Sequence, residues 1–122
     1  MNPSDIIDYN LLEYVRPEKI DLGGYEEAPR FGVIFPSGLI MINKNDPLDE
    51  QIRTILHEII HMHPSFIAYT GGLWERTITR DEQIESEIEK LAQDTFSTRP
   101  DIVDFIKRKL EEAYMNSVNL KG

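Results

Sequence analysis

The chain has 122 residues, no cysteine, and 22 Asp and Glu residues against 13 Lys and Arg residues, for a formal charge of −9. This length predicts one domain over residues 1–122. The missing cysteine excludes disulfides and thiolate metal sites, and the acidic balance argues against a nucleic-acid partner. The first residues, MNPSDIIDYN, lack the basic and apolar regions of a signal peptide. No apolar run approaches the ~18 residues of a membrane helix, so we expect a cytoplasmic protein without a membrane partner.

The predicted elements begin with a helix and a β-hairpin. Ser4 is placed to cap a helix whose large side chains recur at helical spacing (Ile7, Leu11, Tyr14 and Val15). The sequence EKIDLGG after it gives a weak signal for a short strand. Two β-rich runs, RFGVIF and GLIMIN, then flank a Pro-Ser-Gly turn, which is typical of a hairpin.

Three helices are predicted after the hairpin. The first has Asp46 as its cap and Pro47 at its first position, and it runs through the histidines. The second covers 79–96 and is broken by the Arg-Pro pair that follows, and the third covers 101–115. After it the helical pattern lapses, so we expect an extended tail. The fold class is therefore α+β.

All three histidines of the chain lie in one short stretch, TILHEIIHMH at 54–63. At about 100° per residue, the apolar side chains fill one arc of this helix. His57 and His61 stack one turn apart on another face, where two imidazoles can reach one tetrahedral ion. Glu58 lies beside them and can hydrogen-bond a metal-bound water. This is the H-E-x-x-H pattern of zinc peptidases; the alternative is a solvated helix face that carries His and Glu.

A third ligand is required, because a catalytic zinc site takes three protein ligands. On a helical wheel of the second helix, Glu85 falls inside the apolar arc and Glu87 outside it. A carboxylate that faces the core needs a cation or a proton, so Glu85 is the predicted ligand and Glu87 the alternative. Glu89, one turn on, is predicted to accept a hydrogen bond from a ligand histidine. Without the metal, the pKa of Glu85 is expected to rise.

The motif HEIIH at 57–61, followed by ESEIE at 85–89, resembles the arrangement of the gluzincin metallopeptidases. The minigluzincins, small soluble archaeal proteins similar to the catalytic domains of membrane metallopeptidases, are the branch it resembles most. The resemblance implies a small zincin-like domain: an N-terminal helix, a small sheet, an active-site helix, a glutamate helix and a C-terminal helix. Position 89 is Glu here, where these families have Asp or Asn.

The expected function is that of a zinc-dependent endopeptidase acting on peptides or unfolded proteins. Zinc held by His57, His61 and Glu85 is expected to lower the pKa of a bound water. Glu58 is expected to take the proton of that water and pass it to the leaving amine. The alternatives are a regulatory peptidase of the antirepressor and radiation-response type, and a non-catalytic zinc-binding module, which would not need Glu58.

Further expectations concern the oxyanion, the substrate and the tail. Tyr69 is the expected donor to the oxyanion, with His63 as the alternative, although His63 also fits a partly buried residue at a helix end. In the resemblance, strand 39–43 lines the cleft and pairs with extended substrate. The tail, 114–122, is expected either to be a frayed terminus or to dock in the cleft. Docked in a neighbouring copy, it would make a latent homo-oligomer.

Overall fold

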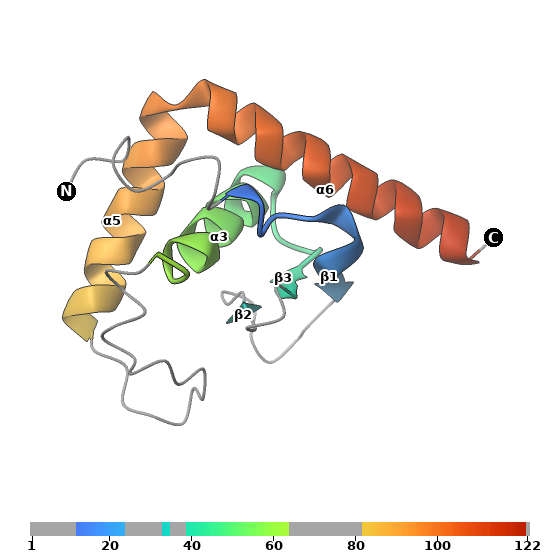
Figure 1. Ribbon diagram of the computed structural model, residues 1–122, viewed down its shortest axis with the longest axis horizontal. Coiled ribbons are helices and arrows are strands. Elements are labelled where there is room, and N and C mark those ends of the chain that lie inside the picture. The colour runs from blue at the N-terminus through green and yellow to red at the C-terminus, as the bar shows by residue number, and fades with distance from the viewer. Residues whose placement is uncertain (1–11, 24–32, 35–38, 64–81, 122) are drawn as a thin grey trace.

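The structure is a computed structural model that describes residues 12–23, 33–34, 39–63 and 82–121 (Figure 1). A small sheet precedes three described helices, which confirms the α+β class. The predicted N-terminal helix falls mainly on residues 1–11, outside the described residues. The elements in chain order are η1 (Pro17–Lys19), β1 (Ile20–Gly23), β2 (Val33–Ile34), β3 (Ile40–Asn43), α3 (Leu48–Ile60), α5 (Glu82–Thr98) and α6 (Pro100–Lys121).

The sheet has the order β1-β3-β2. β2 and β3 pair antiparallel, as predicted for the hairpin, and β1 confirms the weak strand signal by pairing parallel to β3. Ile40 and Met41 of β3 therefore have a neighbouring strand on each side. The expectation that strand 39–43 pairs with substrate is wrong at Ile40 and Met41, because β1 and β2 already pair with the two sides of β3 there.

The turn between β3 and α3 is held by a buried glutamine. α3 begins at Leu48, one residue later than predicted, because Pro47 has an extended backbone (φ −56, ψ 152) and is itself the cap residue in place of Asp46. The Gln51 side-chain amide donates to the carbonyl oxygens of Lys44 at 3.2 Å and Asp46 at 2.8 Å. This contact fixes how α3 leaves the sheet.

α3 occupies the centre of the fold and packs against β3, α5 and α6 (Figure 1). Its predicted apolar arc is buried: Ile52, Ile55, Leu56, Ile59, Ile60 and Met62. The same core contains apolar side chains of the sheet and of both later helices, including Ile42, Ile88, Ile106 and Leu110. Each such side chain contributes about 1.5–3 kcal/mol when fully buried. The predicted ligands His57, His61 and Glu85 are half-buried and lie outside this apolar core.

The break between α5 and α6 is at the predicted place. α5 ends at Thr98 and α6 begins at Pro100, and the Arg99 side chain between them pairs with Asp101. The extended tail is wrong, because α6 continues to Lys121. Weak helix formers cost only a few tenths of a kcal/mol each once a helix is nucleated, and neither Pro nor Gly occurs between Asp101 and Lys121. The predicted docking of the tail in a neighbouring copy required an extended segment, and these residues are helical instead.

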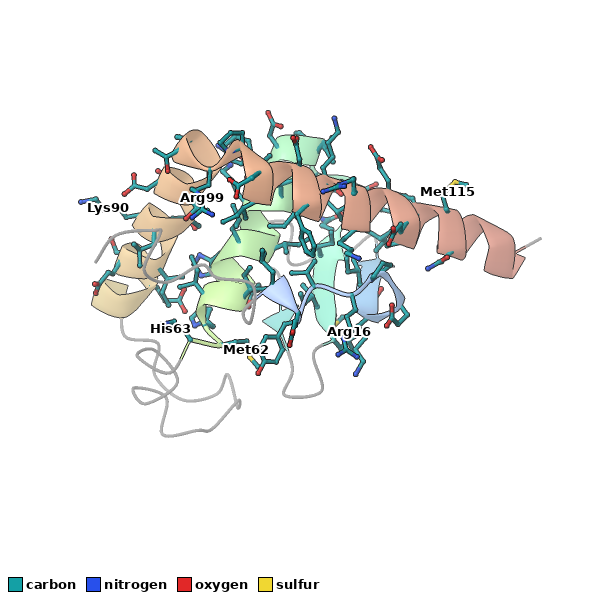
Figure 2. The ribbon with its side chains drawn as sticks, turned by 45° about the horizontal axis from the view of Figure 1, so that its top comes forward. Arg16, Met62, His63, Lys90, Arg99 and Met115 are labelled. Carbon is teal, nitrogen blue, oxygen red and sulfur yellow. The ribbon has the colours of Figure 1, made fainter. Side chains whose placement is uncertain are left out.

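The hydropathy of these helices bears on whether any of them could cross a membrane. Within the described ranges, none of them combines the length and the apolar character that crossing a bilayer requires. Exposed charged residues recur along both α5 and α6, and Figure 2 shows Lys90 on the outer side of α5.

Candidate metal centre

His57 of α3 and His61, the cap residue at the C-terminal end of α3, direct the same ring atom at one point. His57 and His61 lie one turn apart, with ring centroids 5.0 Å from each other. Their Nε2 atoms are separated by 3.3 Å. Both side chains are largely covered, with 17% and 16% of their surface exposed. The i and i+4 spacing thus produces the convergence expected from the sequence.

Glu85 brings a carboxylate from α5 to the same point. Its Oε2 lies 2.8 Å from Nε2 of His57, and its Oε1 lies 3.1 Å from Nε2 of His61. One ligand atom from each of the three residues lies within 4.8 Å of the others. Glu87, the alternative, is exposed and does not belong to this group. The helical wheel predicted this difference, because position 85 faces the core and position 87 does not.

Glu89 contacts the other nitrogen of His57. Its Oε2 lies 2.8 Å from Nδ1 of His57, as predicted for the residue one turn after the ligand glutamate. Glu is one methylene longer than the Asp or Asn of the gluzincin motifs, and it still reaches the ring. A carboxylate on Nδ1 fixes the orientation of the imidazole and increases the basicity of Nε2.

The charges within this group are strongly coupled. Burial lowers the pKa of His57. Hydrogen bonds to Glu85 and Glu89 and the nearby charge of Glu58 have a larger, opposite effect, and the pKa rises to about 9. Burial raises the pKa of Glu85, but hydrogen bonds from His57 and His61 lower it more, to well below its usual range. The expected rise in the pKa of Glu85 is therefore wrong. His57 as an imidazolium is a cation that can pair with this carboxylate.

The chemistry of this donor set fits a metal ion. Two imidazole nitrogens and a carboxylate, without thiolate, suit zinc, and also cobalt or nickel. Ligand atoms at ~2.05 Å from a tetrahedral ion are about 3.3 Å apart, and the two histidine Nε2 atoms are separated by 3.3 Å. Glu85 lies slightly closer to both rings than this, at hydrogen-bond distance. His57, His61 and Glu85 therefore form a group that can hold a metal ion.

The remaining predicted site residues have different positions. Glu58 is only 4% exposed, and its charge acts on His57. The helical wheel placed Glu58 outside the apolar arc, so its burial was not predicted. His63 lies at the end of α3 beside Met62, is half-buried and is not part of the group (Figure 2). Tyr69 lies outside the described residues.

Two neighbours of the centre were not predicted. Gln93 donates from Nε2 to Oε1 of Glu89 at 3.3 Å. The guanidinium of Arg53 lies over the Phe96 ring, 5.4 Å from its centroid, and its charge lowers the pKa of Glu89. The hydrogen bond between Gln93 and Glu89 could have been predicted from the sequence, because residues at i and i+4 on a helix are neighbours.

Comparison of the chain with protein-family models, with curated proteins and with solved structures found no match. The resemblance to gluzincins therefore rests on the HEIIH and ESEIE motifs and on the group that they form. Among the described residues, no second cluster of metal-ligating side chains is found.

Proposed function

We propose that this protein is a zinc-dependent endopeptidase of the gluzincin type. The observation that carries the proposal is the meeting of His57 from α3 and His61 from its C-terminal cap with Glu85 from α5. Glu58, an acid that a purely structural site would not need, lies on the same helix directly after the first of these histidines. Three protein ligands leave a tetrahedral ion one open position, as in catalytic rather than structural zinc sites.

The proton transfer and the positioning of a ligand histidine can each be assigned to a residue of this chain. Zinc held there would supply Lewis acidity, which polarises a peptide carbonyl and makes water a stronger acid. The Glu58 carboxylate accepts one proton from the attacking water as the water oxygen bonds to the carbonyl carbon. It then gives that proton to the amide nitrogen as the C–N bond breaks. Glu89 keeps the His57 ring in place through Nδ1.

The proposed substrate is an extended peptide or an unfolded protein. A strand of substrate adds to the edge of a sheet, where its backbone is recognised with little dependence on sequence. β3 is the middle strand, whereas β2 is an outer strand of the described sheet and contacts α3, the helix that carries His57 and ends at His61. We therefore place the substrate strand beside β2 rather than β3.

The first test is the zinc content of the purified protein. We expect one zinc per chain in the wild type, loss of zinc in His57→Ala, and wild-type zinc content in His63→Ala, the matched control at the end of the same helix. Zinc well below one per chain in the wild type would refute the proposal.

The second test separates a peptidase from a non-catalytic zinc-binding module. Glu58→Gln removes the proton acceptor without removing a ligand, so we expect it to keep zinc and to lose cleavage of an unfolded, fluorescently labelled protein. If the wild type binds zinc and does not cleave this substrate, the non-catalytic module is the better description. Equal cleavage by wild type and Glu58→Gln would exclude Glu58 as the base.

A further inference from the structure

A row of polar side chains extends from the metal centre along the seam between α3 and α5. Glu89 connects His57 with Gln93 in this row, because each of its two carboxylate oxygens accepts a hydrogen bond from one of them. Oε2 accepts from Nδ1 of His57 at 2.8 Å, and Oε1 accepts from Nε2 of Gln93 at 3.3 Å. The amide of Gln93 is therefore two hydrogen bonds away from the Nδ1 atom of His57.

The side chain of Glu89 is half exposed, so packing restrains its orientation less than it restrains that of Glu85. The exposed fraction is 47% for the side chain of Glu89 and 25% for that of Glu85. An exposed glutamate loses rotamer freedom when it is held in one geometry. Gln93 follows Glu89 by one helical turn, the spacing at which side chains on one helix meet. Arg53 provides the neighbouring positive charge from α3, held over the ring of Phe96.

We propose that Gln93 is a positioning residue for the metal centre. Its amide holds Glu89 in the orientation that accepts from Nδ1 of His57, and this keeps Nε2 directed at the point where Glu85 and His61 meet. The inference rests on the proposed zinc site. It assigns a function to a surface glutamine that neither binds the metal nor contacts a ligand histidine.

The experiment is a thermodynamic cycle on Zn²⁺ affinity, measured by competition with a chromophoric chelator. Gln93→Ala and the near-isosteric Gln93→Met both remove the donor, and Ser97→Ala is the matched control one turn further along the exposed face of α5. Glu89→Ala is expected to weaken zinc binding about 10–100-fold, as for other partners of ligand histidines. The Gln93 variants are expected to weaken it by roughly 2–5-fold, the size of an exposed side-chain pair one turn apart on a helix. Ser97→Ala should bind as the wild type does.

The decisive comparison is made in the Glu89→Ala background. If Gln93 acts through Glu89, adding Gln93→Ala there should cause no further loss of affinity. A full 2–5-fold loss in that background, or wild-type affinity in both single Gln93 variants, would overturn the inference. Either result leaves the zinc site itself intact. Failure of the wild type to bind Zn²⁺ would instead refute the proposed function. Melting of the metal-free variants confirms that each is folded.

Discussion

The metal-free protein is predicted to lose stability as the pH rises from about 6.5 to about 9, because of His57. The folded pKa of His57 lies above its ordinary value, so the folded state binds more protons than the unfolded state within this window. The stabilisation is therefore complete below pH 6.5 and is lost as the pH rises through 9. The difference between 6.5 and about 9, at 1.36 kcal/mol per pKa unit, corresponds to about 3 kcal/mol. Because Glu89 is half exposed, solvent screening makes this an upper value.

The assay is urea unfolding of the chelator-treated protein between about pH 6 and about pH 10. The charged groups facing His57 are Glu85 and Glu89 from α5 and Glu58 from α3. His57→Gln should abolish most of the decrease in the free energy of unfolding, and Glu85→Gln should reduce it. His63→Gln is the matched control, since His63 is not part of the cluster, and it should keep the wild-type pH dependence.

Two results would refute this reasoning. One is an undiminished decrease in His57→Gln, which would assign the pH dependence to another group. The other is a decrease that is already complete between pH 4.5 and 6.5, which would mean that the pKa of Glu85 is raised. The structure predicts the opposite for Glu85, whose lowered pKa removes stability as the pH falls below 4.5.

Three further predictions concern binding and packing. Zinc at 100 times its dissociation constant should raise the free energy of unfolding by ~2.7 kcal/mol, and this gain should vanish in His57→Gln when both are measured by urea unfolding. Ile59→Ala, at a position with no exposed surface, should cost about 2–5 kcal/mol. Leu48→Ala, at a position 41% exposed on the same helix, should cost less than about 0.5 kcal/mol by the same assay. Tyr114→Phe removes the hydroxyl that donates to Oε1 of Gln51 at 3.2 Å; thermal melting should show a loss of about 0.5–1.5 kcal/mol.

A zinc ion in this site would be a ligand of the folded chain rather than the cause of its folding. The predicted ligands His57, His61 and Glu85 are half-buried, whereas the core consists of buried apolar side chains from the sheet and the helices. The buried side-chain nitrogen and oxygen atoms of the described residues all have hydrogen-bond partners within the protein. We therefore expect the metal-free protein to be folded at neutral pH, in contrast to small domains that fold only when zinc binds.

The sequence alone determined those parts of the centre that depend on helical spacing. His57 and His61 are one turn apart on any helix that covers both, and the wheel of the next helix separates Glu85 from Glu87. The break at Arg99 was likewise predicted, because proline is excluded from a helix interior. These properties depend on residues within a few positions of one another.

Tertiary structure decided the rest. The pairing of β1 with β3, the burial of Glu58 and the proton affinity of His57 each depend on what approaches from a distant part of the chain. Periodicity predicted Glu85 and Glu89 as partners of the histidines, but it does not show how far the packed helices bury the imidazole of His57. The pKa of His57 is set by the balance between desolvation and those two contacts, so its direction is decided only when α3 and α5 pack together.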